Sequence, residues 1–167
     1  WDMPGRSMNV FTLELMYELE SIVAQVAGDT AIQCAVITSG KDSFSGGADL
    51  TMFKGLQKQY LEESARNRDA AVRMLFDGIG RMTGLFRKLE TSGKPWVSAI
   101  NGTCMGGAFE LSLACHGRVA ADSDAVKMAL PEVKVGLFPG AGGTQRVPRL
   151  TDQQQALQML TDPEMRL

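Results

Sequence analysis

Long apolar runs, cysteine and histidine are all scarce in this 167-residue chain. No run approaches the roughly 18 apolar residues of a membrane-spanning helix, so we expect no membrane span. The 3 cysteines, Cys34, Cys104 and Cys115, stand in apolar or helical contexts without the spacing of metal ligands. This predicts buried, reduced thiols and no metal site. The only histidine, His116, follows a predicted helix, where a cation would complement the helix dipole, so we interpret it as structural rather than catalytic.

Strong charge and nucleotide-binding motifs are also missing. Lys and Arg number 17 against 19 Asp and Glu, a formal net charge of −2, so no strong field would attract nucleic acid and we expect no nucleic-acid partner. The run S-G-K-D-S at residues 39–43 does not fit the phosphate-binding P-loop pattern. The glycines at residues 138–143 are not a G-x-G-x-x-G motif after a strand with an acidic residue about 20 positions later, so they predict no dinucleotide site.

The remaining composition is that of one ordinary globular domain. With 44% hydrophobic and 22% charged residues, the chain is long enough for one core, and we predict a single domain over residues 1–167. The expected strands and helices alternate, which indicates an α/β fold. We expect helices at residues 12–27, capped by Thr12, and over most of 50–90, where Gly78, Gly80 and Gly84 weaken the pattern. We expect a buried strand at 32–38, short strands at 118–121 and 125–130, and a turn at 144–147.

The most informative stretch is residues 95–145. A proline precedes the apolar run 96–100, which predicts a buried strand that Asn101-Gly102 ends. Gly106 and Gly107 then open a predicted helix over residues 108–115. Because a glycine pair leaves the backbone N–H groups at a helix start unobstructed, this junction can bind an anion or a developing oxyanion.

Two glutamates accompany this junction. Glu110 lies one turn inside the predicted helix among apolar neighbours, and Glu132 follows Pro131 in another apolar segment. A desolvated carboxylate gains proton affinity unless a cation pairs with it. Oxyanion donors together with poorly solvated carboxylates indicate proton-transfer chemistry on a carbonyl compound.

A second glycine-rich junction reads S-F-S-G-G-A-D-L at residues 43–50. It offers N–H donors near Gly47 and Ala48, just before a predicted helix. Alone it would be an ordinary glycine loop. Because the chain has the other junction as well, we interpret both as parts of one site.

These residues also carry a family resemblance. The runs I-N-G-x-x-x-G-G-A-x-E and L-P-E-V-x-x-G-x-x-P-G-A-G-G-T-Q-R resemble the crotonase, or enoyl-CoA hydratase/isomerase, superfamily. The sequence around A-C-H-G-R-V-A-A-D most resembles the hydratase part of multifunctional fatty-acid oxidation enzymes, of the 3-hydroxyacyl-CoA dehydrogenase or alpha-subunit type. The resemblance covers nearly the whole chain. It implies a ClpP-like spiral of β-β-α units from which the C-terminal helical segment is missing, and both ends of the chain look cut.

The resemblance implies a role for each site residue. Glu110 is the base that activates water, Glu132 delivers the proton at C2, and the amides of Ala48 and Gly107 form an oxyanion hole. The sequence leaves open whether Arg6 is a phosphate contact or an exposed surface arginine. The further contacts with substrate and coenzyme A that the resemblance implies come from Arg6, Ser7, Met8, Gly46, Gly47, Asp49, Leu50, Gly106, Pro131, Pro139 and Gly140.

The function that the resemblance implies is enoyl-CoA hydratase, with an acyl-CoA thioester as substrate and no cofactor beyond the coenzyme A of the substrate. The alternatives are a 3,2-enoyl-CoA isomerase, which needs a single proton shuttle, and a non-catalytic crotonase-like binding module. The expected assembly is a homo-oligomer, a trimer or dimer of trimers, or part of a multifunctional fatty-acid oxidation enzyme. The expected compartment is intracellular and reducing: the cytoplasm if the protein is bacterial, the mitochondrion or peroxisome if it is eukaryotic.

Overall fold

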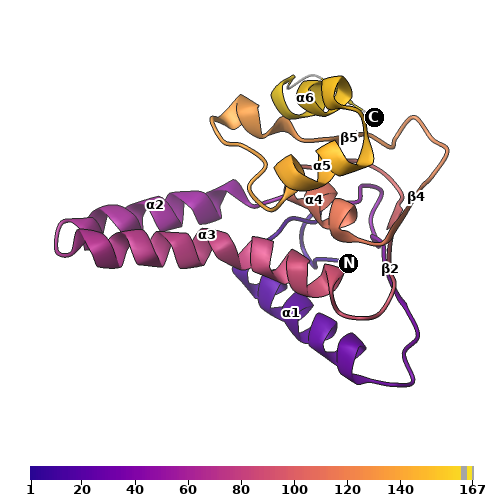
Figure 1. Cartoon of the computed structure of the whole chain (residues 1–167), viewed down its shortest axis with the longest axis horizontal. Coiled ribbons are helices and arrows are strands. Elements are labelled where there is room, and N and C mark those ends of the chain that lie inside the picture. Colours follow the sequence, from indigo (N-terminus) through magenta and orange to yellow (C-terminus); the bar gives the residue numbers. More distant parts are fainter. Residues whose placement is uncertain (163–164, 167) are drawn as a thin grey trace.

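The computed structural model describes residues 1–162 and 165–166 and shows a mixed α/β chain (Figure 1). The expectation that the C-terminal end is cut refers partly to residues outside the described ones, namely Pro163, Glu164 and Leu167. The helices are α1 (Leu13–Gly28), α2 (Leu50–Ser64), α3 (Arg68–Glu90), α4 (Gly107–Ala114), the 3₁₀ helix η1 (Pro131–Val135), α5 (Gly143–Leu150) and α6 (Gln153–Thr161). The strands are β1 (Ala35–Ile37), β2 (Trp96–Ile100), β3 (Cys104–Met105), β4 (Gly117–Ala120) and β5 (Met128–Ala129).

The strands pair in parallel, as an alternation of strands and helices predicts. β1, β2 and β4 form one sheet with β2 in the middle, and β3 pairs with β5 in a second ladder. Trp96, Ser98 and Ile100 of β2 are buried and alternate with partly buried residues. The central strand and the helix after it therefore form where the sequence predicts them, and the α/β prediction is confirmed.

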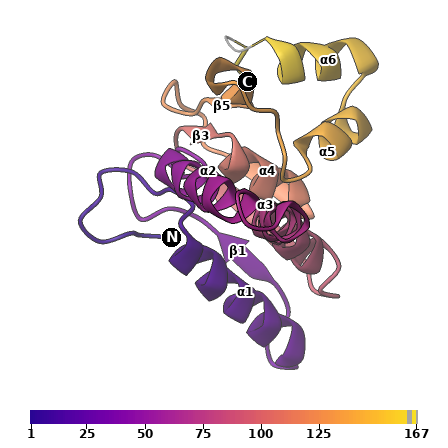
Figure 2. The same cartoon turned by 90° about the vertical axis from the view of Figure 1, so that its left-hand side faces the viewer.

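Helix α1 begins as its sequence predicts. The hydroxyl of Thr12 accepts a hydrogen bond from the backbone N–H of Leu15, which satisfies one of the free donors at the helix start. Met16, Val23 and Val26 are the buried face of the helix. Figure 2 shows α1 beside β1 at the end of the molecule that is opposite to α5 and α6. No helix in the described part of the chain is both long and apolar enough to cross a membrane.

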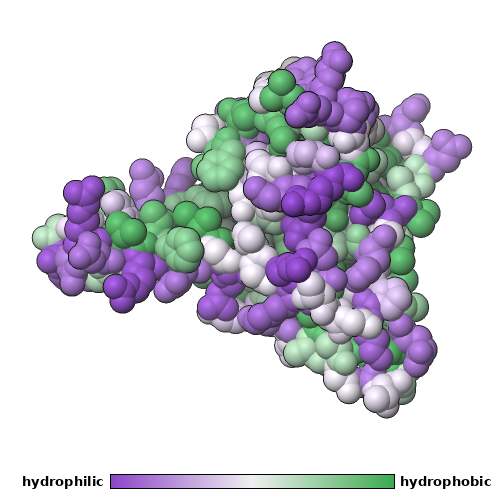
Figure 3. Space-filling model, viewed as in Figure 1, coloured by the Kyte–Doolittle hydropathy of each residue, from purple (hydrophilic) through white to green (hydrophobic). Residues whose placement is uncertain are grey.

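Residues 50–90 form two helices, α2 and α3, which lie side by side and project from the body as an arm (Figure 1). Asn67 caps α3 by accepting the N–H of Ala70. Helix α3 runs unbroken through its glycines, and Gly78 packs against α2, where an added β-carbon would stand 3.1 Å from Leu56 Cδ2. The arm carries apolar surface (Figure 3), including exposed Leu61, Val72 and Phe76.

Three local predictions are wrong, each for a tertiary or capping reason. The strand predicted at residues 32–38 is only β1, and its Val36 is 62% exposed because it shares one face of the sheet with Val119 of β4, which is equally exposed, so the described residues leave this face open there. Cys34, just before it, is exposed, whereas Cys104 and Cys115 are buried, and all three thiols are free. The turn predicted at 144–147 is helix α5, which Gly142 starts from a left-handed backbone conformation.

Helix α4 lies at the centre of the molecule, and every residue from Gly107 to Ala114 is buried. It contacts α3, α5, β3 and β4. The surrounding core includes Phe11, Phe44, Phe86 and Trp96. A helix enclosed on all sides cannot shift easily, so a side chain that it carries into a cavity is held rigidly.

Candidate active site

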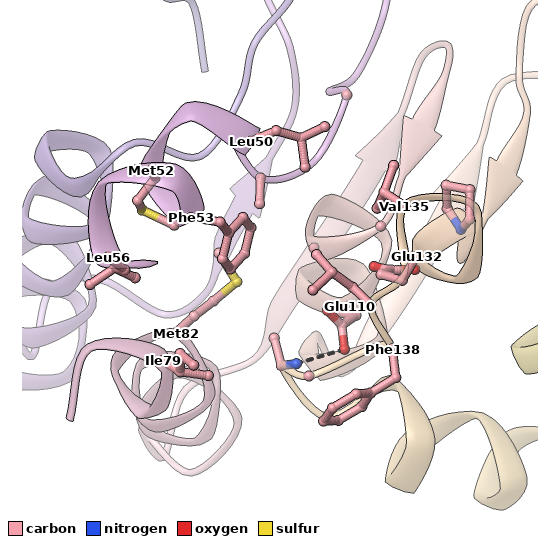
Figure 4. A pocket seen from close by; sticks show the side chains of 18 of the residues that line it. Leu50, Met52, Phe53, Leu56, Ile79, Met82, Glu110, Glu132, Val135 and Phe138 are labelled. Carbon is pink, nitrogen blue, oxygen red and sulfur yellow. Dashed lines mark hydrogen bonds between the residues drawn. The ribbon is translucent and has the colours of Figure 1, made fainter. Parts of the chain in front are cut away.

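A cavity of about 430 Å³ lies between the α2–α3 arm and the elements α4 and η1 (Figure 4). Figure 4 shows Glu110 and Glu132 on one side of it, and Met52, Phe53 and Met82 on the other. An apolar cavity with a few convergent polar groups is the usual form of a small-molecule site. The apolar side chains in its wall include Met16, Leu50, Met52, Phe53, Leu56, Ile79, Met82, Val135, Leu137 and Phe138.

Glu110 reaches the cavity from the first turn of α4 and is only 2% exposed. Its Oε1 accepts backbone hydrogen bonds from Ala141 and from Gly143, both at 2.8 Å. Burial raises the pKa of Glu110 to about 7, and the charge of Glu132 acts in the same direction. The two backbone hydrogen bonds and the charge of Arg146 oppose this rise. A carboxyl with a pKa near neutrality can take up or release a proton under physiological conditions.

Glu132 enters the same cavity from η1, in which Pro131 is the first residue. Its Oε2 is buried and has no hydrogen-bond partner among the described residues. Burial raises the pKa of Glu132, and a hydrogen bond within its own residue opposes the rise. The carboxyl lies against Gly106, where an added β-carbon would stand 2.9 Å from Oε1. The positive φ of 54° favours a glycine at this junction, and a side chain here would in addition push the Glu132 carboxyl from its place.

The two glycine-rich junctions meet at the wall of this cavity. A β-carbon on Gly47 would stand 3.3 Å from the nitrogen of Gly107, and one on Gly107 would stand 3.8 Å from the nitrogen of Ala48. Phe11 bonds to the residues on either side of Ala48 in a parallel bridge, so the N–H of Ala48 itself points away from Phe11. Gly107 is the first residue of α4, and its N–H has no acceptor within the helix. Ala48 and Gly107 both line the cavity.

The loop that bonds to Glu110 is fixed from its other side. Thr83 Oγ1 of α3 donates to the carbonyl of Gly140 at 2.9 Å. Arg146 Nη1 of α5 donates to the carbonyl of Ala141 at 3.0 Å. The backbone that presents donors to the carboxyl is thus bonded to two neighbouring helices.

Arg146 is in turn held by Glu90 at the end of α3. Arg146 Nε lies 3.2 Å from Glu90 Oε1, and Nη2 lies 3.3 Å from Oε2, a forked pairing of guanidinium and carboxylate. The hydrogen bond from Arg146 lowers the pKa of Glu90. Thr83, Glu90 and Arg146 are not among the residues that the sequence predicted at the site. Of the three, only Arg146 stands in a recognisable motif, the T-Q-R run after Gly143. Thr83 and Glu90 bond to partners distant in the chain, which no local pattern indicates.

The structure brings together many, but not all, of the residues expected at the site. Gly47 packs against the backbone of Met105, and Pro139 is buried and packs against Gly143. The expected residues that line the cavity are Gly46, Ala48, Leu50, Gly106, Gly107, Glu110, Pro131, Glu132 and Gly140. Those outside the lining are Arg6, Ser7, Met8, Gly47, Asp49 and Pro139.

The N-terminal segment has contacts of its own. Arg6 is half-exposed and pairs with Asp49 at 3.0 Å, while Asp49 caps α2 by accepting the N–H of Thr51. Met8 packs against Gly46, where an added β-carbon would stand 2.7 Å from Met8 Sδ. A phosphate contact by Arg6 stays a prediction.

His116 lies outside the cavity wall, and its Nδ1 accepts the backbone N–H of Trp96 at 3.1 Å. This bond connects the end of α4 to the start of β2, which agrees with a structural role. In the part of the chain that the structure describes, no three His, Cys, Asp or Glu side chains gather as metal ligands would.

Comparison with known proteins identifies the family. The model of the enoyl-CoA hydratase/isomerase family matches residues 3–164, so the chain belongs to that family, as the sequence motifs predict. Among curated proteins, the chain is 40% identical over 99% of its length to the fatty acid oxidation complex subunit alpha of Idiomarina loihiensis, and 41% identical to that of Shewanella loihica. The chain spans 22% of the length of each of these relatives.

Solved structures show the same fold. An enoyl-CoA hydratase from Bacillus anthracis is 31% identical with a TM-score of 0.76, over 97% of this chain and 57% of that one. A second one, from Shewanella pealeana, is 21% identical with a TM-score of 0.79, over 96% of this chain and 55% of that one, and supports the fold alone. The predicted crotonase fold is therefore confirmed, and this chain matches a little over half of each neighbour.

Proposed function

We propose that this chain forms the active site of an enoyl-CoA hydratase, which adds water across the 2,3-double bond of a 2-enoyl-CoA to give a 3-hydroxyacyl-CoA. The observation that carries the proposal is the pair of carboxyl groups at one apolar cavity, that of buried Glu110 and that of partly buried Glu132. Hydration needs one group to take a proton from water and another to give a proton to carbon.

The surroundings of the carboxyl groups favour different protonation states. Glu110 Oε1 accepts two backbone N–H groups, and such donors stabilise an ionised carboxylate. Glu132 has a buried oxygen without a partner among the described residues, which favours the neutral acid. In the proposed reaction, ionised Glu110 accepts a proton from water as the water oxygen bonds to C3. Neutral Glu132 then gives its proton to C2, and proton exchange with solvent restores both groups.

The backbone at the two junctions completes the proposed site. As water adds, negative charge develops on the thioester oxygen, and the N–H groups of Ala48 and Gly107 would donate to it. A single donor of this kind contributes about 3 kcal/mol in other enzymes. The apolar space between the α2–α3 arm and η1 would hold the hydrocarbon chain.

The family name covers isomerases as well as hydratases, and the presence of both carboxyl groups at the cavity favours the hydratase. The test is to mix the full-length protein with crotonyl-CoA and follow the ultraviolet band of the enoyl thioester. A hydratase bleaches this band and forms 3-hydroxybutyryl-CoA. Unchanged absorbance with crotonyl-CoA, together with conversion of a 3-enoyl-CoA to its 2-enoyl isomer, would select the isomerase. Binding without either reaction would select the non-catalytic module.

We further propose that the chain is the hydratase part of a fatty-acid oxidation enzyme that needs no cofactor for this step. The support is about 40% identity to proteins named as alpha subunits of fatty acid oxidation complexes. Those relatives are bacterial, and the cysteines of this chain are free, which suits the reducing bacterial cytoplasm. Sequencing the complete reading frame tests this placement, because it reveals whether a 3-hydroxyacyl-CoA dehydrogenase region accompanies the hydratase.

A further inference from the structure

The peptide unit between Gly140 and Ala141 connects two hydrogen bonds. Its carbonyl, on Gly140, accepts from Thr83 Oγ1 at 2.9 Å, and its N–H, on Ala141, donates to Glu110 Oε1 at 2.8 Å. The peptide is trans, so its C=O and N–H point in opposite directions within one rigid plane. A partner that fixes the carbonyl therefore also fixes the direction of the N–H.

The second donor to Glu110 is oriented differently. The N–H of Gly143 belongs to the peptide whose carbonyl is on Gly142, and that carbonyl accepts the N–H of Arg146 at 2.9 Å within the first turn of α5. This peptide cannot turn without unwinding the helix. The Gly140–Ala141 peptide precedes the helix, and Gly140 lacks the β-carbon that limits rotation.

We propose that Thr83 is a positioning residue, whose hydroxyl holds the Gly140–Ala141 peptide in the orientation that points its N–H at Glu110. Without this hydroxyl the peptide can rotate and turn the carbonyl of Gly140 toward the carboxyl instead. A carbonyl is an acceptor, so it repels a carboxylate and accepts a hydrogen bond from a neutral carboxylic acid. Thr83 thereby favours the ionised form of Glu110, although it does not touch that side chain or the cavity.

The effect of Thr83 on Glu110 can be measured separately from the effects of the charged groups near Glu110. Glu132 on η1 raises the pKa of Glu110, and Arg146 on α5 lowers it. Thr83 carries no charge, and its replacement by valine leaves both neighbours in place. It lies on the exposed side of α3, so we expect its substitution to preserve the fold. A change in the pKa of Glu110 in such a variant would report the orientation of the peptide.

The decisive variant is Thr83→Val, which keeps the shape of threonine and loses the hydroxyl. Thr83→Ser keeps the hydroxyl and serves as rescue. Thr91→Val is the matched control, because among the described contacts the hydroxyl of Thr91, the residue that ends α3, bonds only to the carbonyl of Arg87 in that helix. The pKa of Glu110 is followed by carbon NMR of labelled glutamate carboxyls in the full-length protein, with Glu110→Gln to assign the signal.

We expect Thr83→Val to raise the pKa of Glu110 by about one pH unit, the scale set by one hydrogen bond to a charged group. Thr83→Ser and Thr91→Val should leave it unchanged. The acid limb of the pH profile of kcat/KM should shift upward with the same variant, while kcat at alkaline pH stays close to that of the parent.

An unchanged or lowered pKa in Thr83→Val would overturn the proposal, as would an equal rise in Thr91→Val. Only the kinetic measurement rests on the proposed function, since the NMR titration needs no turnover. If the parent protein fails to hydrate crotonyl-CoA but Thr83→Val still raises the pKa, the hydratase proposal fails and the role of Thr83 stands.

Discussion

Glu132 Oε1 lies so close to Gly106 that a β-carbon on the glycine would stand 2.9 Å from this oxygen. Gly106 has a φ of 54° and directly precedes α4, which carries Glu110. One glycine thus adjoins one proposed catalytic carboxyl and starts the helix that holds the other.

We expect Gly106→Ala to disrupt the site and weaken the fold. The methyl group must displace Glu132, and the left-handed backbone of an alanine costs about 1–3 kcal/mol. Urea unfolding should show a loss of that size, and hydration should fall at least 100-fold, the lower end of what a proton-transfer group contributes. Gly84→Ala in α3 is the control: its β-carbon would meet nothing within 4 Å, so helix propensity should make it neutral or stabilising by up to about 1 kcal/mol. Equal losses in the two variants would contradict the special role of Gly106.

The variants Glu110→Gln and Glu132→Gln test the carboxyl pair directly. Each keeps the shape of the side chain but removes proton transfer, so we expect kcat to fall by about 10²–10⁴ with little change in CoA-thioester binding. If both groups act on one water, their carboxyl oxygens stand roughly 4–6 Å apart, and the double variant should be barely worse than the worse single one. Steady-state hydration kinetics of the parent and the three variants measure this. Two small losses that multiply in the double variant would indicate that the glutamates are structural.

The raised pKa of Glu110 predicts that stability falls with rising pH. Its pKa is about 7 in the folded protein against an ordinary value of 4.5, so the folded state binds more protons than the unfolded state between these values. The free energy of unfolding should therefore fall from about pH 4.5 to about pH 7, by up to about 3 kcal/mol from this group. When the free energy of unfolding is measured with urea at several pH values in this range, it should depend less steeply on pH for Glu110→Gln than for the parent. Parallel curves for parent and variant would show that the carboxyl titrates normally.

The proposed oxyanion hole predicts the position of a bound thioester. A crystal structure with a 3-hydroxyacyl-CoA should place the thioester oxygen within about 3.2 Å of the nitrogens of both Ala48 and Gly107. The two nitrogens should then lie within about 5 Å of each other, facing one cavity. A thioester oxygen bound to neither amide would remove these residues from the proposed site.

The assembly state is a further prediction. We expect the full-length protein to self-associate, as a trimer or dimer of trimers, or to dock on a covalently linked dehydrogenase region. Exposed apolar side chains on the described surface, such as Phe76 and Phe138, are consistent with a partner surface. Analytical ultracentrifugation of the full-length protein measures the mass. A monomer without any further domain would contradict the expectation.

Several elements were predictable because they depend on neighbours in sequence. The cap of α1 by Thr12, the buried strand β2 and the start of α4 at Gly107 follow from local hydrogen bonding, apolar pattern and backbone freedom. The position of Glu110 one turn inside a buried helix follows in the same way. The family motifs then indicated which chemistry these residues serve.

Only the tertiary structure decided how distant segments meet. Glu110 bonds to residues 31 and 33 positions away, and Thr83 bonds to a carbonyl 57 positions away. Val36 is exposed because the described residues leave open the face of the sheet that it shares with Val119, which its apolar sequence does not reveal. Local patterns specify helices and strands through contacts a few residues apart. Which donors surround a buried carboxyl, and hence how strongly it holds its proton, depends on packing between segments that no local pattern relates.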